Sequence, residues 1–273
     1  MTPSTSRFAH LVESIFPFYN TQKNPAPKAP VVYKGNMTAE ERPRAIAVYC
    51  GSSPGKDKAY QEAAASLGRA MAEANRPLVY GGGSKGIMGI VSGAVIKGGG
   101  EVTGVVPHAM TRGGGEGDKT SSKSAPVLLS EPGREKAKTI LVGSMHERKI
   151  EMATRAGGFI GLPGGFGTFE EVMEVITWTQ IGIHNKPVVL VNVRGFYEPL
   201  RLLIKNAIRD GFINPDNETL AIFVDGPADH AEHETFDWGK ASLEALDNWE
   251  GPPWAMFDWT TKVGGGKEAM SRT

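Results

Sequence analysis

The sequence has a single cysteine, Cys50, among its 273 residues. One cysteine cannot form an internal disulfide or a cysteine-rich metal site, and it is typical of a protein from a reducing compartment. The sequence also has no run of eighteen apolar residues and no basic head followed by an apolar stretch at its N-terminus, so we predict neither a transmembrane helix nor a signal peptide. These absences predict a cytoplasmic protein with no membrane partner.

The chain lacks net charge as well, because 30 Lys and Arg residues balance 30 Asp and Glu residues. A balanced charge gives no bulk attraction for nucleic acid, so we expect no nucleic-acid partner and only local anion binding. Spacing typical of metal ligands is missing too: neither His146 nor His184 has a second histidine at that spacing, and no Glu or Cys constellation joins His230 and His233. We therefore predict no metal and no cofactor.

From Arg44 onward the sequence alternates short apolar runs with helical periods, which is typical of βαβ units. A chain of this length with 40% hydrophobic residues can bury one full core. We predict an α/β fold: a single domain over residues 44–249 with a Rossmann-like, open, mainly parallel sheet flanked by helices. The predicted strands are 45–50, 78–80, 102–106, 158–162, 187–193 and 220–224. The predicted helices are 59–74, 87–96, one that begins after Ser144, 169–181, 197–209 and 230–249.

Three segments fall outside this rhythm. Residues 1–43 contain a short amphipathic piece and a proline-spaced run, which predict either an arm lying on the domain or on a second subunit, or a disordered leader. Residues 107–133 are rich in glycine and serine and too long for an ordinary connection, so they predict a lid, an inserted loop or a disordered excursion. Residues 250–273 predict a tail anchored by two tryptophans with a loose end.

The most informative stretch runs from Ile160 to Glu171, where an apolar strand end leads through Pro163-Gly164-Gly165-Phe166-Gly167-Thr168 into a helix. Glycines let the backbone turn tightly and bring its N–H groups against a ligand, and the helix start, expected near Thr168, adds partial positive charge. The stretch predicts a phosphate site with two carboxylates, Glu170 and Glu171, in the first helical turn.

Glu171 has two possible roles. Thr168 and Glu171 have capping-box spacing, so the carboxylate could do no more than bond the N–H of Thr168. The second acid in the same turn, Glu170, favours a functional role, and the nearby helix N-terminus should keep Glu171 ionised. An ionised carboxylate suits a base or an oxocarbenium stabiliser, and we expect Glu171 to give up the cap.

A second glycine turn, Gly81-Gly82-Gly83-Ser84-Lys85-Gly86, follows the strand over 78–80. Its G-x-G-x-x-G spacing matches the dinucleotide fingerprint, but the next strand ends without the acid that would hold a ribose. Its G-x-S-x-G spacing matches a nucleophile elbow, so a hydrolase that uses Ser84, Asp225 and His230 stays an alternative. A Walker A motif is not satisfied. Two such turns in one sheet favour a phosphorylated ligand.

The segment Ser144-Met145-His146-Glu147-Arg148-Lys149 has capping-box spacing, which places Arg148 and Lys149 just past the first turn of a helix. Together with Pro163–Glu171, it resembles the LONELY GUY family of cytokinin-activating phosphoribohydrolases, often mislabelled as lysine decarboxylases. The family pattern Pro-Gly-Gly-x-Gly-Thr-x-x-Glu is met at Pro163–Glu171, and Met-His-x-Arg-Lys at Met145–Lys149. Tyr49-Cys50-Gly51-Ser52-Ser53, and Tyr80-Gly81-Gly82-Gly83-Ser84 with Gly86 and Met88-Gly89, also look like the family's first two turns, so the resemblance spans roughly residues 45–224.

The resemblance implies hydrolysis of the N-glycosidic bond of a cytokinin riboside 5′-monophosphate to free base and ribose 5-phosphate, with AMP as a plainer substrate. It implies that Arg148 and Glu171 are catalytic, although Arg148 is permanently protonated and cannot be a general acid. The substrate-binding residues expected with it are Ser52, Gly82, Gly83, Ser84, Met145, Lys149, Gly164, Gly165, Phe166, Gly167, Thr168, Glu170 and Thr177.

In the LONELY GUY family a neighbouring subunit completes the site, so the resemblance implies a homodimer or a higher homo-oligomer. A non-catalytic nucleotide-binding or carrier protein on the same fold is the alternative from another functional class. Lysine decarboxylation is disfavoured, because the sequence has no identifiable site for pyridoxal phosphate.

Overall fold

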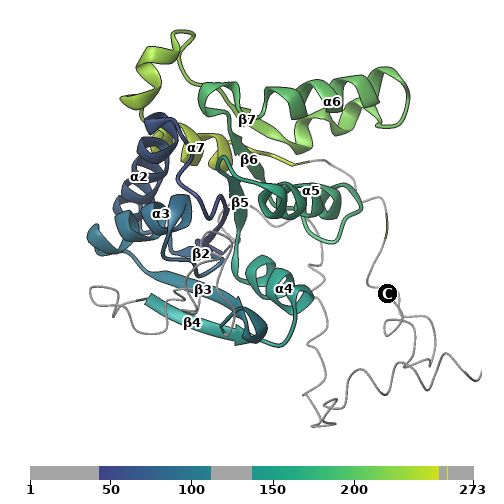
Figure 1. Cartoon of the computed structure of the whole chain (residues 1–273). Coiled ribbons are helices and arrows are strands. Elements are labelled where there is room, and N and C mark those ends of the chain that lie inside the picture. Colours follow the sequence, from purple (N-terminus) through teal and green to yellow (C-terminus); the bar gives the residue numbers. More distant parts are fainter. Residues whose placement is uncertain (1–42, 112–136, 252–256, 258–273) are drawn as a thin grey trace, which may run out of the picture.

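The computed structural model of the protein describes residues 43–111, 137–251 and 257 (Figure 1). Its centre is a seven-stranded sheet in the order β4-β3-β2-β1-β5-β6-β7, in which every neighbouring pair of strands is parallel. The strands are β1 (Ile46–Tyr49), β2 (Leu78–Tyr80), β3 (Val102–Pro107), β4 (Ala137–Val142), β5 (Gly158–Gly161), β6 (Val188–Val191) and β7 (Ile222–Val224). The predicted open, parallel α/β sheet is confirmed.

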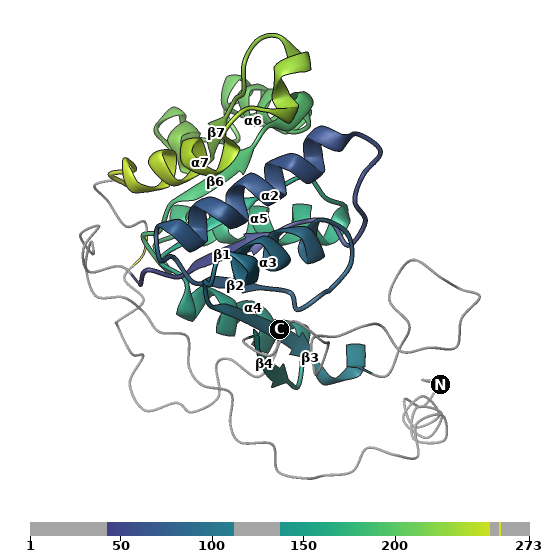
Figure 2. The same cartoon turned by 90° about the vertical axis from the view of Figure 1, so that its left-hand side faces the viewer.

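Helices cover both faces of the sheet (Figures 1 and 2). The helices of one face are α2 (Lys58–Glu73), α3 (Gly86–Lys97) and α7 (Trp238–Asp247). Those of the opposite face are α4 (Met145–Arg155), α5 (Phe166–Gln180) and α6 (Glu198–Arg209). Short 3-10 turns connect some of them: η1 (His108–Thr111), η2 (Val193–Gly195), η3 (Pro215–Leu220) and η4 (His230–Glu234).

Each face of the sheet has its own core, because successive strand side chains point to opposite faces. Along β1, Ile46 and Val48 pack with the cluster that contains Leu67 of α2. Between them, Ala47 and Tyr49 belong to the cluster on the other face. Burial on both faces explains why the strands read as continuous apolar runs rather than as alternating ones.

The edge strand β4 is missing from the predicted strands. It pairs with β3 along its whole length, from Ala137 opposite Val102 to Val142 opposite Pro107. None of its six residues is fully buried, and Lys138 is exposed. The run Thr139-Ile140-Leu141-Val142 has the apolar, β-branched composition of a strand and could have indicated β4, but it was overlooked.

The predicted helix over 230–249 is wrong as a single element, because η4 and α7 replace it. Asp237 separates them: its carboxylate accepts the N–H of Lys240 and caps the start of α7. A capping aspartate in the middle of an apolar pattern therefore marked a boundary.

The predicted arm, most of the predicted insertion and most of the predicted tail lie outside the described residues. In the part of the chain that is described, no helix is both long and apolar enough to cross a bilayer.

Candidate active site

Three adjacent strands, β2, β1 and β5, end in glycine turns that meet at the carboxyl edge of the sheet. Gly51, after β1, donates its N–H to the carbonyl oxygen of Pro163 at 3.1 Å, and its own carbonyl accepts the N–H of Met88 at 3.2 Å. Gly82, after β2, has φ +80°, and a Cβ there would overlap Val106. The turns thus form one backbone surface at the edge where open α/β sheets bind ligands.

The turn after β5 enters its helix earlier than predicted. α5 begins at Phe166, with Gly165 as N-cap and no side-chain capping bond. Thr168 lies inside the helix, so the capping box with Glu171 does not form, and the expected loss of the cap is confirmed. The placement of Glu170 and Glu171 in the first turn is wrong, because both lie in the second turn. The positive end of α5 is left without a capping side chain.

Gly164 is the most confined glycine of this turn. A Cβ there would overlap Thr168 Oγ1 and lie 2.8 Å from the nitrogen of Gly51. At Gly165 and Gly167, by contrast, an added Cβ would meet no described atom within 4 Å, and both residues are exposed. Packing between the turns therefore requires Gly164, whereas Gly165 and Gly167 leave open space at the start of α5.

Arg148 of α4 and Glu171 of α5 face each other, with Nη2 and Oε1 3.9 Å apart and each side chain 11% exposed. Arg148 Nη1 contacts Met145 Sδ at 3.8 Å, and its Nε is buried with no hydrogen-bond partner among the described residues. A Cβ on Gly81 would overlap Arg148 Nη2, so the guanidinium also lies against the second glycine turn. At this long separation the guanidinium keeps N–H donors available for a ligand.

Burial opposes the ionised state predicted for Glu171. Its pKa is raised to about 7, because burial disfavours the ionised carboxylate more than Arg148 favours it, while Glu170 raises the pKa further. Desolvation therefore outweighs the predicted influence of the helix terminus, and Glu171 is partly ionised near pH 7. A carboxyl group with a pKa near 7 can exchange a proton at neutral pH.

Where Glu171 faces the sheet, the nearby titratable groups are in their neutral forms. Burial raises the pKa values of Tyr49 and Cys50, and the charge of Glu171 raises both further. Tyr49 stacks on Phe159 with ring centroids 6.0 Å apart, and the Tyr197 hydroxyl donates to the carbonyl oxygen of Leu162 at 2.8 Å. These packed side chains supply the low-polarity surroundings that shift Glu171.

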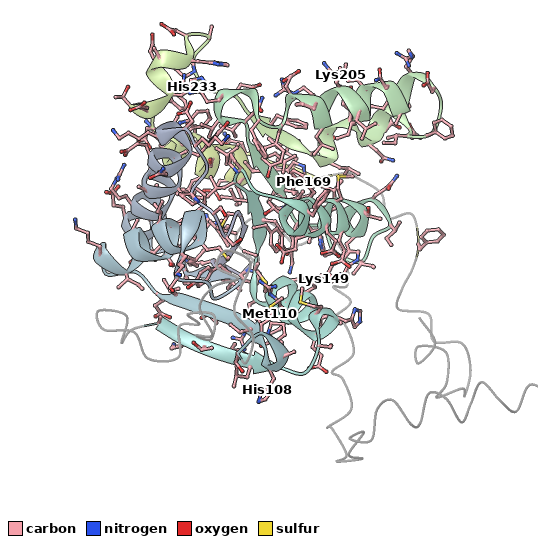
Figure 3. The ribbon with its side chains drawn as sticks, viewed as in Figure 1. His108, Met110, Lys149, Phe169, Lys205 and His233 are labelled. Atoms are coloured by element: carbon pink, nitrogen blue, oxygen red, sulfur yellow. The ribbon has the colours of Figure 1, made fainter. Side chains whose placement is uncertain are left out.

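Lys149 follows Arg148 on α4 and contacts the two carboxylates that flank Glu171 on α5. Its Nζ lies 2.6 Å from Glu170 Oε1 and 2.9 Å from Glu174 Oε1. Figure 3 labels Lys149 on α4 and Phe169 on the neighbouring α5. Lys149 and Glu170 were predicted to bind substrate, and the structure pairs them with each other. Glu174, four residues after Glu170 on the same helix, was missed, although that spacing could have indicated it.

Three further predicted site residues, Phe166, Met145 and Thr177, lie on α4 and α5. Phe166 is 91% exposed at the start of α5, and Met145 is 41% exposed at the start of α4. Thr177 lies three turns along α5, where its hydroxyl donates to the carbonyl oxygen of Met173, so the structure does not bring it to the glycine turns.

The hydrolase alternative with Ser84 is not assembled. Ser84 follows β2 and Asp225 follows β7, strands four positions apart in the sheet, or about 19 Å at the usual strand spacing. Asp225 accepts bonds from Arg201 and Asn192 instead. Among the described residues, no group of three His, Cys, Asp or Glu side chains could hold a metal ion.

A family model described as "Possible lysine decarboxylase" matches residues 88–233. The chain is 48% identical over 176 residues to cytokinin riboside 5′-monophosphate phosphoribohydrolase LOG7 of Arabidopsis thaliana, covering 64% of this chain and 74% of that protein. It is 41% identical over 226 residues to the rice protein named "Probable cytokinin riboside 5'-monophosphate phosphoribohydrolase LOGL9", covering 83% of this chain and 92% of that protein. The chain belongs to the LONELY GUY family.

The description of the family model differs from the names of these relatives, which are phosphoribohydrolases. A Moco carrier protein from Chlamydomonas reinhardtii is similar at 21% identity and a TM-score of 0.46, over 75% of this chain and 97% of that one. In this member of the LONELY GUY family, both motifs named from the sequence meet: one supplies Arg148 and the other supplies Glu171.

Proposed function

We propose that the protein hydrolyses the N-glycosidic bond of a cytokinin riboside 5′-monophosphate, releasing free base and ribose 5-phosphate, with AMP as a plainer substrate. The observation that carries the proposal is the buried, widely spaced pair of Arg148 and Glu171 beside an uncapped helix start. The names of the rice and Arabidopsis relatives support the same substrate class.

The phosphate of the substrate binds at the start of α5. Gly165 and Gly167 are exposed, and an added Cβ at either would meet no described atom within 4 Å, so a phosphate has room to approach their N–H groups. The positive end of the helix dipole favours a dianion there. Gly164 and Thr168 shape this turn from within, and the neighbouring turns add Ser52, Gly82, Gly83 and Ser84 to the proposed surface.

Glu171 acts on the attacking water. In its ionised form it takes a proton from water as the water oxygen bonds to C1′ of the ribose and the bond from C1′ to N9 breaks with its electron pair leaving on the base. The base takes up a proton from solvent, and Glu171 returns its own to solvent, so the free base forms and the carboxylate is restored. Its negative charge also stabilises the positive charge that develops on the ribose ring. A pKa near 7 gives a substantial ionised fraction at neutral pH.

Arg148 binds and orients the substrate. Its guanidinium has N–H donors beside both Glu171 and the second glycine turn. A planar fork in this position suits two oxygen atoms of a phosphate or of a ribose. A permanently charged guanidinium supplies hydrogen bonds and charge, and it moves no proton.

Incubation with isopentenyladenosine monophosphate tests the proposal. We expect chromatography to show release of the free base by the unaltered protein, and a rate about 10³-fold lower for Glu171→Gln, which removes the proton acceptor while keeping the shape of the side chain. Nucleotide binding by calorimetry without base release at micromolar enzyme would instead identify a carrier.

We further propose a cytoplasmic protein that acts as a homodimer or a higher homo-oligomer, with each site completed by a neighbouring subunit. Support comes from apolar side chains exposed beside the site: Phe166, Phe169, Met173 and Met145. Such clusters on soluble proteins mark interaction surfaces. Light scattering during gel filtration should give at least twice the mass of one chain, and an active monomer would contradict the assembly.

A further inference from the structure

Two ion pairs of different strength lie side by side between α4 and α5. Arg148 and Glu171 are 3.9 Å apart at their nearest atoms. One residue along α4, Lys149 Nζ lies 2.6 Å from Glu170 and 2.9 Å from Glu174. The lysine side chain is 16% exposed and that of Glu174 is 23% exposed, whereas that of Glu170 is 52% exposed, so the contact with Glu174 is the one better shielded from water. The short contacts, and not the long one, therefore restrain the two helices.

The short contacts join the two helices that flank β5 in the sequence and lie on the same face of the sheet. α4 precedes the strand and α5 follows it, and Glu170 and Glu174 lie one helical turn apart on α5. A cation between two carboxylates of one helix is held against sliding in either direction along it. This geometry fixes the position of α4 relative to α5, and with it the position of Arg148 relative to Glu171.

Lys149, Glu170 and Glu174 also affect the ionisation of Glu171. Besides burial, the charged groups that influence its pKa are Arg148, Lys149, Glu170 and Glu174. Tyr49 and Cys50, at the end of β1, are the buried titratable groups nearby. Arg148 and Lys149 lower the pKa of Glu171, whereas Glu170 and Glu174 raise it. Burial raises the pKa of Glu171 most, and Lys149 opposes the further rise that Glu170 and Glu174 cause.

We infer that Lys149, Glu170 and Glu174 form an electrostatic clasp that positions Arg148 against Glu171 and sets the pH above which the site is active. The inference rests on the proposed function, which needs an ionised Glu171. It replaces the predicted substrate contact of Lys149 with a positioning role, since two of the three ammonium donors are directed to carboxylates.

Opposite substitutions test the clasp, with kcat/KM measured against pH. Lys149→Met removes the positive charge and should move the acidic limb of the profile upward by about half a pH unit to one unit. Glu174→Gln removes a negative charge and should move the same limb downward by a similar amount. Lys149→Arg keeps the charge and should leave the limb near that of the unaltered protein.

Arg155→Met is the matched control. Arg155 lies on the same helix as Lys149 and pairs with Glu151 four residues earlier, but it is not among the groups that influence Glu171. Its removal should leave the acidic limb in place. Thermal unfolding of every variant distinguishes a destabilised fold from a folded protein in which Arg148 has moved relative to Glu171.

Two results would overturn the clasp: limbs of Lys149→Met and Glu174→Gln that move in the same direction or stay in place, or a rise in KM alone for Lys149→Met, which would restore a direct substrate contact. Carboxyl ¹³C NMR titration of Glu171 gives the same comparison without turnover. Absence of base release by the unaltered protein would therefore refute the proposed function, while the titration still decides the clasp.

Discussion

The two ends of the sheet each bury a charged side chain, and they hold it in different ways. At the carboxyl end, Arg148 and Glu171 stay 3.9 Å apart. At the amino end, Lys186 precedes β6, is 2% exposed and donates to the carbonyl oxygen of Ala153 at 2.6 Å. A buried group bonded within the protein stabilises the fold, whereas one with unused bonding capacity is prepared for a ligand.

The surroundings at the amino end favour neutral forms. Burial lowers the pKa of Lys186 to about 7. Burial, together with the charge of Lys186, lowers the pKa of His184 to about 3. His184 stacks on Phe159 at 5.1 Å, and its Nδ1 lies 3.3 Å from Thr179 Oγ1. Lys186 and His184 are thus packed in the core at the end of the sheet away from the glycine turns.

The largest effect that separates the two ends is expected for Arg148→Lys. A lysine keeps the charge but cannot form the planar fork that would contact two substrate oxygens, so kcat/KM should fall about 10²-fold. The melting temperature should change little, because the arginine makes no short ion pair among the described residues. Steady-state kinetics with AMP measure the loss, and a variant with unchanged kcat/KM would remove Arg148 from the site.

A smaller effect, confined to stability, is expected for Lys186→Met. The ordinary lysine pKa of 10.5 is lowered to about 7 in the folded protein, so between these values the unfolded chain binds a proton that the folded chain does not. Stability from Lys186 therefore rises with pH, by about 2 kcal/mol from pH 7 to pH 9, and Lys186→Met should lack this rise.

Urea unfolding at several pH values measures the difference between the two proteins. Equal slopes against pH would mean that Lys186 stays charged in the fold. Base release should be unaffected by Lys186→Met, because the side chain lies at the opposite end of the sheet from the glycine turns.

A stability effect of similar size and opposite sign is expected for Glu171→Gln, in addition to its loss of activity. The folded pKa of Glu171, about 7, lies above its ordinary value of 4.5, so in this window the folded chain binds the extra proton and stability falls as pH rises. Gln cannot ionise, and the variant should gain on the unaltered protein by about 2.5 kcal/mol from pH 5 to pH 8. The same unfolding series tests this, and a gain that shrinks with pH would place the folded pKa below 4.5.

Local signals predicted the sheet, the glycine turns and the two helices that supply Arg148 and Glu171. The Ser144 cap is one example, since its hydroxyl accepts the N–H of Glu147, although the Glu147 carboxylate binds the N–H of Gly143 rather than that of Ser144. Properties that depend on packing could not be read in this way. The raised pKa of Glu171 is set first by its burial, which depends on how α4, α5 and the sheet pack together, and β4 pairs with β3 along its whole length.

The order of the strands in the sheet determines which motifs meet, and motif spacing along the sequence could not show this. Ser84 and Asp225 have the chain order of a catalytic triad, but their strands are four positions apart. The turns at Gly51, Gly81 and Pro163 meet because β2, β1 and β5 are neighbours. Contacts across these turns, such as that of Gly81 with Arg148, follow from that order and have no counterpart in any single motif.

The buried thiol of Cys50 has a practical consequence for spectroscopy. It is the sole cysteine of the chain, it is 8% exposed, and burial raises its pKa, so it should resist maleimide reagents at neutral pH. A cysteine introduced at the exposed Thr177 of α5 would then carry a fluorophore or spin label without background from the native sequence. Distances between labels on two subunits could be measured in the working protein with its own thiol left untouched.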